Sequence, residues 1–346
     1  MIILTNCLAE KNDEGCLKVA GSLIRRQKTQ EPNTMVISYG ESSQGADLHL
    51  PVNKWMISPR LWLLLWRRKE PLLYIPAVAK GHAMAIRIFI LSLFCRRGLR
   101  VVVAMQHSLS PFWSFWLKCS GAELFALSRE SWKYYADRIG NCASYLKTGV
   151  DTRRFTPVEP EKKLQLREKY GIPREKMVVL HVGHLKAGRN VGQLLNLDDR
   201  FHGILVASSY ASEQKDAQLR RQITEKENLT LMDTYLPNIE EIYQLSDVYL
   251  FPVVAEHNCI DVPLSAMEAA ACGIPVVATS FGELKELLME EGFYEITSFE
   301  PESLNSLLAK AAKEQKNPRD SVLEYDWNQS VRKLFMNSEK IGGNRK

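Results

Sequence analysis

Short apolar runs alternate with amphipathic segments along the first part of the chain. Residues 1–6 (MIILTN) and 33–40 (NTMVISYG) have the composition of strands, and the segment between them has the spacing of a helix. The apolar residues on one face of that helix, which Gly15 would open, are Cys16, Val19, Ala20, Leu23 and Ile24. The cycle continues with strands expected over 71–76, 99–107, 123–128 and 143–150 and helices expected over 79–97 and 128–139. This order predicts a parallel sheet with crossover helices.

A polar, proline-containing stretch over 151–173 interrupts the cycle and predicts a linker with a short helix. A second cycle follows, with strands expected over 176–185, 203–210, 229–236, 248–253 and 274–280. An amphipathic helix, in which Val331, Leu334 and Phe335 align, is expected last. The pattern therefore predicts two α/β domains, 1–152 and 153–320, and a final helix at about 321–346. Ligands bind at the carboxyl ends of such strands, so two facing domains predict a cleft between them.

The composition is that of an ordinary globular protein, with 45% apolar and 25% charged residues among 346. We expect no signal peptide, and no run approaches the roughly 20 apolar residues of a membrane-spanning helix. The seven cysteines are scattered, without a C-x-x-C pair. This spacing argues against a zinc site and a disulfide framework, and a reducing cytoplasm is the simplest location.

The net charge of +5 is unevenly distributed, because residues 1–150 have a net charge of +10 and the remainder −5. Aromatic residues accompany the positive charges within segments 53–71, 94–100 and 110–119. This combination suits peripheral docking at an anionic membrane surface, here the inner leaflet. The candidate residues on this acceptor side are Trp62, Trp66, Arg67, Arg68, Arg96 and Arg97. The alternative is that the tryptophans are core and the arginines solvated. Nucleic acid is a weaker candidate, because the chain contains no recognised binding module.

The most informative stretch is CIDVPLSAMEAAACGIPVVATSFG, residues 259–282. Pro263 suits the first position of a helix, where its missing N–H is not needed. The next backbone N–H groups, of Leu264, Ser265 and Ala266, are expected to be unpaired at the helix start, to point out of it and to be able to hold a phosphate. Glu268, one turn further on, could accept hydrogen bonds from two ribose hydroxyls. The alternative is that Glu268 only complements the helix dipole.

The segment from 247 to 287, DVYLFPVVAEHNCIDVPLSAMEAAACGIPVVATSFGELKEL, resembles the donor-binding segment of family 4 (group 1) of the retaining glycosyltransferases. Segments that resemble other motifs of this family are HVGHLKAGRN (181–190), TGVDTRRFTP (148–157), ALSRES (126–131), AMQHS (104–108) and IYQLSDVYLFP (242–252). The resemblance implies the GT-B fold, with two Rossmann-like domains facing a cleft and the last helix crossing back to the first domain.

The resemblance also implies roles for single residues of the donor site. Glu268 would hold the ribose, and N–H groups near Leu264 and Ser265 the distal phosphate. Arg189 stands where the family has a pyrophosphate-binding lysine. In the phosphate loop, Gly183 is followed by His184 in place of an arginine, and Lys186 could supply the lost charge. In the first domain, His107 stands where the family places a histidine beside the transferred sugar, the alternative being an ordinary loop histidine.

One departure concerns the sugar contact. The family has a glutamate eight positions before the ribose-binding glutamate, and here that residue is Ile260. Another side chain could replace this contact, either Asp261, the favoured candidate, or Glu256. Alternatively, backbone N–H groups and His107 hold the sugar alone, or the protein is an inactive relative. The chain offers no D-x-D clamp for Mg²⁺, since LDD (197–199) has no second acidic element, so we expect transfer without a metal or other cofactor.

The expected function is therefore transfer of a sugar from a nucleotide-sugar to an acceptor hydroxyl with retention of configuration. The expected enzyme is a hexosyltransferase-type glycosyltransferase of cell-surface glycan or glycolipid synthesis, acting on a glycan or lipid-linked acceptor. Two alternatives remain. An epimerase would need acid and base carboxylates near the sugar, and a non-catalytic protein would bind the nucleotide-sugar and dock a complex.

Overall fold

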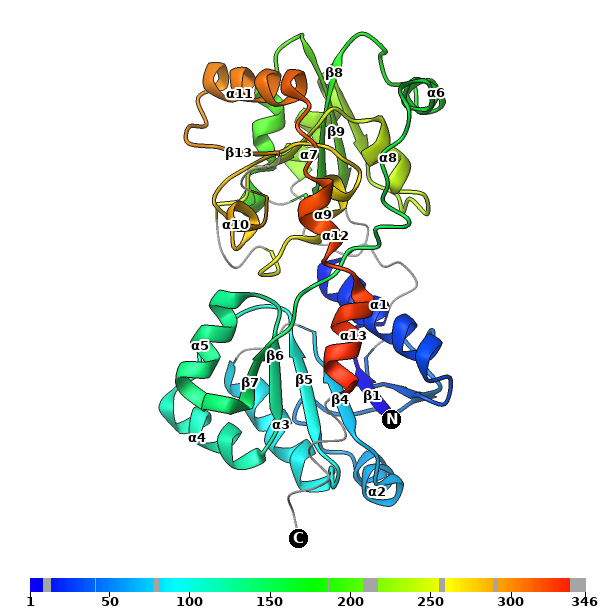
Figure 1. Cartoon of the computed structure of the whole chain (residues 1–346), viewed down its shortest axis with the longest axis vertical. Helices are drawn as coiled ribbons and strands as arrows, with labels where there is room; N and C mark the ends of the chain where they lie inside the picture. Colours follow the sequence, from blue (N-terminus) through cyan, green and yellow to red (C-terminus); the bar gives the residue numbers. More distant parts are fainter. Residues whose placement is uncertain are drawn as a thin grey trace. The chain divides into compact units, whose positions relative to one another are not determined.

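The chain forms two compact units in the computed structural model (Figure 1). One unit comprises Met1–Gly149 with Trp327–Lys346, and the other comprises Val150–Asp326. The structure describes residues 1–8, 14–40, 42–77, 81–185, 187–207, 217–254, 259–288 and 292–336.

The first unit is built on a parallel sheet with the strand order β3-β2-β1-β4-β5-β6-β7. The strands are β1 (Ile2–Thr5), β2 (Met35–Ser38), β3 (Leu48–His49), β4 (Leu72–Ile75), β5 (Leu99–Val103), β6 (Glu123–Ala126) and β7 (Ala143–Tyr145). Each strand predicted for this part of the chain is present, whereas β3 was missed. Two residues flanked by polar sequence give no periodic signal, and β3 forms because it pairs with β2.

Five helices of the first unit precede its last strand. They are α1 (Gly15–Gln30), α2 (Pro59–Arg68), α3 (Gly81–Phe94), α4 (Pro111–Ser120) and α5 (Arg129–Ile139), and a single turn, η1 (Gly140–Cys142), follows α5. α2 and α4 begin alike, with a serine cap before a proline, and the cap hydroxyls of Ser58 and Ser110 accept from Leu61 and Trp113 N–H groups. Contacts between successive helices from α2 to α5 make them one layer.

The last helix of the chain, α13 (Trp327–Met336), belongs to the first unit and packs beside α1 (Figure 1). Val331 and Leu334 are fully buried there. The Ser330 hydroxyl donates to the Lys147 carbonyl at 2.6 Å, and the Arg100 guanidinium donates to the Leu334 carbonyl. The predicted GT-B arrangement of two Rossmann-like sheets with a returning final helix is therefore confirmed.

The second unit has a parallel sheet with the strand order β10-β9-β8-β11-β12-β13. The strands are β8 (Met177–Gly183), β9 (Phe201–Ala207), β10 (Leu229–Met232), β11 (Val248–Phe251), β12 (Val276–Ala278) and β13 (Phe293–Glu295). The helices are α6 (Pro160–Lys169), α7 (Ala217–Glu225), α8 (Glu240–Leu245), α9 (Leu264–Ala271), α10 (Leu284–Leu288), α11 (Pro301–Glu314) and α12 (Arg319–Leu323), with the short turns η2 (Ala187–Arg189) and η3 (Val191–Asn196). The five predicted strands are present, and only the edge strand β13 was missed.

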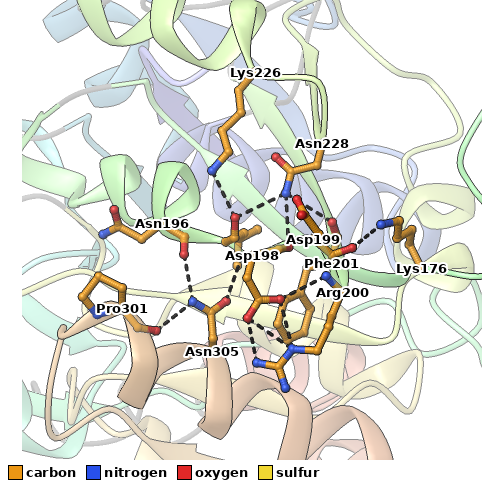
Figure 2. A network of polar contacts seen from close by, with 11 residues as sticks. Lys176, Asn196, Asp198, Asp199, Arg200, Phe201, Lys226, Asn228, Pro301 and Asn305 are labelled. Atoms are coloured by element: carbon orange, nitrogen blue, oxygen red, sulfur yellow. Dashed lines mark hydrogen bonds and ion pairs between the residues drawn. The ribbon is translucent and has the colours of Figure 1, made fainter.

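A network of polar contacts closes the amino-terminal edge of this second sheet (Figure 2). The buried Asn305 amide on α11 accepts from the Asp198 N–H at 3.2 Å and donates to the Asn196 and Pro301 carbonyls at 2.8 and 2.7 Å. The Asn228 amide donates to three carbonyls of the same turn, including that of Phe201 at 3.3 Å. These bonds fix the turn before β9 on α11, at the edge opposite the carboxyl ends of the strands.

None of the helices in the described parts of the chain combines the length and the apolar character needed to cross a bilayer.

Candidate functional site

The strand order of the second sheet reverses between β8 and β11. At such a switch point the loops after the two neighbouring strands diverge, which leaves a crevice at their carboxyl ends. The loop after β8 contains His184 and Arg189, and the loop after β11 leads to Pro263 and α9. The donor residues predicted from the sequence therefore come from the two loops that border one switch point.

The start of α9 supplies unpaired backbone donors. Pro263 has φ −65° and ψ 106°, so it precedes the helix instead of occupying its first position as the sequence suggested. Its carbonyl accepts from the N–H groups of Ala266 at 3.1 Å and Met267 at 3.3 Å, so the Ala266 N–H is not one of the unpaired donors that the sequence suggested. The N–H groups of Leu264 and Ser265 have no acceptor within the helix and point out of its start, where they suit an anion.

Glu268 is buried, with 5% of its surface exposed, and it accepts a hydrogen bond from the Tyr243 hydroxyl at 2.8 Å. Burial, followed by the Glu268 charge, raises the pKa of Tyr243 well above its usual value, so the hydroxyl remains a donor. Tyr243 lies on α8 and also contacts the Phe155 ring edge-on, at 5.6 Å between centroids. Glu268 is thus held in place by a side chain from α8. Its environment therefore involves more than a favourable interaction with the dipole of its own helix. Tyr243 lies within the motif IYQLSDVYLFP, which gave no indication of this contact.

Arg189 is a buried cation, with 9% of its surface exposed. Its Nε atom has no hydrogen-bond partner among the residues that the structure describes. A Cβ atom at Gly183 would lie 3.1 Å from Arg189 Nη1 and 3.1 Å from His181 Nε2. Gly183 therefore gives the guanidinium room beside the end of β8, and a buried guanidinium with a free donor is suited to bind an anion.

His181 is the second polar side chain that the motifs did not identify. It is fully buried on β8, and its Nδ1 lies 2.8 Å from the Leu250 carbonyl, which places the proton on Nδ1. Its ring stacks on Tyr249 and Phe251 at centroid distances of 6.3 and 6.4 Å. Burial, followed by the charge of Arg189, lowers the pKa of His181 from 6.5 to about 4. The ring is therefore neutral, and its Nε2 is an acceptor without a partner among the described residues. Its position between two apolar residues gave no sequence signal.

The loop before α9 is closely packed. Cys259 is buried, which raises the pKa of its thiol, and the charge of Arg189 opposes that rise. Ile260 is buried too, so the residue that replaces the family's first glutamate contributes packing and no polar group. Asp261 is half-buried, and its backbone carbonyl lies close to Gly282. Gly282 has φ +52°, and a Cβ atom there would collide with that carbonyl. Asp261 remains a candidate for the sugar contact.

Two further candidates of the donor loops differ in what the structure says of them. His184 directly follows β8 and is half-buried. Lys186 and Glu256 lie outside the described residues. The proposed replacement of the family's arginine by Lys186 therefore stays a prediction.

His107 lies in the first unit, in the segment that follows β5. Its N–H donates to the Tyr135 hydroxyl at 2.8 Å, and the residue is half-buried. It borders a small hollow at the carboxyl ends of β4 and β5 together with Cys16, Pro76 and Met105. A buried tyrosine on α5 thus fixes the backbone of this candidate.

The acceptor-side candidates divide into packed and exposed side chains. Trp62 stacks on Phe94 at 4.7 Å between centroids, and its indole donates to the Met56 carbonyl at 3.0 Å. Trp66, by contrast, is 49% exposed, with the Arg96 guanidinium 4.8 Å from its ring. Arg67, Arg68 and Arg97 are exposed, and Arg68 is 3.3 Å from Glu70.

Among the described residues, no group of three or more His, Cys, Asp or Glu side chains could hold a metal ion. In the LDD stretch, the Asp198 carboxylate binds the Arg200 guanidinium at 2.7 Å, and Arg200 lowers the pKa of Asp198 (Figure 2). Asp198 lies before β9, at the opposite edge of the sheet from the α9 start.

These two sheets, each with a topological switch point, place the chain in the GT-B class of α/β proteins. Comparison with known structures agrees. A glycosyltransferase from Rickettsia africae ESF-5 has a TM-score of 0.78 at 15% identity over 99% of both chains. HepE from Anabaena, whose structure contains UDP, has a TM-score of 0.76 at 15% identity over 98% of this chain and 99% of its own. At these identities the likeness shows the fold.

Sequence similarity to known glycosyltransferases is confined to part of the chain. Residues 178–314 match the family described as Glycosyl transferases group 1. The protein EpsD of Bacillus subtilis (strain 168), described as a glycosyltransferase, is 25% identical over 153 residues, which are 42% of this chain and 39% of EpsD. The match to the group 1 glycosyltransferases therefore lies within the second unit, where the motifs predicted it, and the chain spans about two fifths of that relative's length.

Proposed function

We propose that the protein is a retaining glycosyltransferase that takes its sugar from a nucleoside diphosphate sugar bound to the second unit. The observation that supports this most directly is the buried Arg189 guanidinium, whose Nε has no partner among the described residues. A buried cation with an unused donor is costly unless an anion binds it. A diphosphate meets that requirement, and the structure of HepE, a protein of similar fold, contains UDP.

In this proposal the leaving nucleoside diphosphate is bound by three groups. Glu268, positioned by Tyr243, accepts hydrogen bonds from the ribose hydroxyls. The N–H groups of Leu264 and Ser265 bind the distal phosphate, and Arg189 neutralises the charge that develops as the glycosidic bond breaks. Lys186, Gly183 and His184 complete the phosphate loop. The cations and the N–H groups at the helix start neutralise the negative charge of the leaving diphosphate, which a divalent metal does in other transferases. In this proposal, transfer therefore proceeds without a metal.

The sugar and the acceptor side of the proposal involve other residues. His107 and Asp261 are proposed to contact the transferred sugar, since Ile260 offers no polar group. The acceptor is a hydroxyl of a glycan or a lipid-linked glycan, and the enzyme works in the cytoplasm at the inner face of a membrane. The pathway is proposed to be cell-surface glycan or glycolipid synthesis.

Nucleotide binding to the purified full-length chain tests the donor site. For wild type we expect UDP to bind more tightly than UMP, and more tightly than 2′-deoxy-UDP. R189Q should remove the advantage of UDP over UMP, and E268Q should remove the advantage of UDP over its 2′-deoxy analogue. Each loss should be about 10- to 100-fold, which is the value of a hydrogen bond to a charged group.

The control is R200Q, which removes an exposed guanidinium at the opposite edge of the second sheet from the loops and should leave all affinities unchanged. GDP and ADP are measured alongside, because the base is not specified by these residues. Binding that is insensitive to both R189Q and E268Q contradicts the proposed site. Turnover then separates the remaining candidates. A transferase yields a glycoside with the donor's anomeric configuration, an epimerase changes the sugar itself, and a scaffold binds without turnover.

A further inference from the structure

Large apolar side chains are exposed on three successive helices of the first unit. Phe112 and Phe115 on α4 are 61% and 60% exposed, Leu93 on α3 is 57% exposed, and Leu63 and Trp66 on α2 are 50% and 49% exposed. The opposite sides of these helices pack into the core beneath them, through Leu61, Leu65, Ile88, Leu91 and Leu117. The exposed residues therefore have no place in the core of their own unit.

Aromatic contacts join the three helices into one layer. Trp62 on α2 stacks on Phe94 of α3, and Phe89 on α3 meets the edge of Trp116 on α4 at 4.9 Å. Trp116 in turn contacts Phe112 and Phe115 at 6.3 and 5.7 Å. Because half-buried rings connect α2 to α4 without a break, the exposed residues lie on the outer side of a continuous layer. We refer to Leu63, Trp66, Leu93, Phe112 and Phe115 as the outer apolar patch.

Positive charge predominates around the outer apolar patch, where the nearby acids Glu70 and Asp137 have Arg68 and Arg138 beside them. Exposed cations on or directly after these helices are Arg60, Arg67, Arg68, Arg96, Arg97 and Lys118. The sequences of α2, α3 and α4 contain no aspartate or glutamate. Arg96 lies over the Trp66 ring, which places a cation directly at an exposed aromatic side chain.

We infer that the outer apolar patch is a docking surface for an anionic lipid bilayer. Aromatic and leucine side chains enter the boundary between headgroups and acyl chains, while flanking arginines bind lipid phosphates. A protein partner would need an acidic surface with an apolar centre, whereas a bilayer offers both properties over any area. The inference deepens the proposed function and depends on it for its purpose, because a lipid-linked acceptor has to be reached from a membrane surface.

Vesicle flotation of the full-length protein tests this surface. We expect wild type to float with vesicles of phosphatidylcholine mixed with phosphatidylglycerol, and to remain unbound with phosphatidylcholine alone. F112S/F115S should lower the bound fraction about 10-fold or more, since each ring loses apolar burial in the bilayer. R96S/R97S should lower the bound fraction at low salt. Added salt should then reduce the binding of this variant less than that of wild type, because the cations that salt screens have been removed.

Matched controls come from the second unit, where Leu164 and Leu323 are 41% and 44% exposed. L164S and L323S should float as wild type does. Quenching of tryptophan fluorescence by brominated lipids should be strong in wild type and weak in F112S/F115S, because Trp66 belongs to the patch and Trp116 contacts both phenylalanines.

Three results would overturn the inference. Wild type could fail to float with the anionic vesicles, or the control variants could lose as much binding as the patch variants. The third is that wild type forms oligomers in the absence of vesicles and F112S/F115S is monomeric. The last result would assign the patch to contacts between copies of the chain. UDP affinity is measured on the same variants and should not change. Failure of flotation with intact UDP binding therefore leaves the proposed donor site standing, and the reverse pattern leaves the membrane surface standing.

Discussion

At the residue scale, the candidate donor site depends on a few side chains that are buried and incompletely satisfied. Arg189 and His181 both lie against Gly183, where any Cβ would press on them. Each has a polar atom without a partner among the described residues. Such atoms are costly within a folded protein, so their presence together at a sheet's switch point indicates a place kept for a polar ligand.

His181 gives the second unit a pH-dependent stability. Its pKa falls from 6.5 in the unfolded chain to about 4 in the folded one, because burial disfavours the charged ring. The stability is therefore complete above the unfolded pKa and declines as the pH falls through this range, where only the unfolded chain binds the proton. Between about pH 7.5 and about pH 5 we expect His181 to account for a loss of about 2 kcal/mol.

Urea unfolding of wild type and H181Q at both pH values measures this contribution. The variant keeps a side-chain donor for the Leu250 carbonyl but has no group that titrates. Its free energy of unfolding should fall by about 2 kcal/mol less than that of wild type over the same interval. Equal declines in the two proteins would show that other groups, such as the buried His202, account for the pH dependence.

At the scale of elements, turns held by side chains fix the ends of strands and helices in the second unit. The Asn305 amide fastens α11 to the turn before β9 (Figure 2). Arg319 acts similarly at the C-terminal end of α9, since its guanidinium donates to the Ala271 carbonyl and to the Phe155 carbonyl. A cation at a helix C-terminus complements the helix dipole, so α9 is held firmly in position.

The variant N305A should destabilise the second unit by about 1–3 kcal/mol, because it removes a buried amide and leaves the Asp198 N–H and two carbonyls without their side-chain partner. Chemical unfolding measures the change. The neighbouring N196A, which removes an exposed amide, should change stability by less than about 0.5 kcal/mol. UDP affinity of N305A at a temperature where it is folded should equal that of wild type, and a marked loss would show that the turn before β9 also shapes the binding loops.

At the scale of the whole molecule, the chain is two units whose membership does not follow sequence order. The first unit is completed by α13, which comes after the entire second unit in the sequence. Trp327, Val331 and Leu334 are buried in it, and Gly149 is required at the crossing because a Cβ there would strike the Trp327 ring. The stability of the first unit therefore depends on residues at the far end of the chain.

The variant L334A should destabilise the first unit by about 2–5 kcal/mol through the cavity that it leaves. R332A, at an exposed position of the same helix, is the control and should change stability by less than about 0.5 kcal/mol. Hydrogen exchange followed by mass spectrometry distinguishes the units. Protection should fall in peptides from residues 1–149 in L334A and stay unchanged in peptides from 150–326. Equal losses in both would contradict the assignment of α13 to the first unit.

The sequence by itself determined the alternation of strands and helices, because buried parallel strands need uninterrupted apolar runs and the helices that cover them need an apolar stripe. It also indicated the candidate donor motif, since a helix start with small residues and one carboxylate is a local feature of the chain. The two short edge strands β3 and β13 were not predicted, because they form by pairing with a neighbouring strand and have no distinctive composition.

The tertiary structure alone decided which polar groups meet. Tyr243 on α8 reaches Glu268 on α9, although the sequence gives no sign that this pair belongs together. His181 and Arg189 share one motif, but only the fold buries the His181 ring beside the Arg189 charge. It also separated Trp62, which is packed on Phe94, from Trp66 and the phenylalanines of the outer apolar patch, which are exposed. Burial and partnership depend on how distant segments pack, and a one-dimensional pattern does not specify that packing.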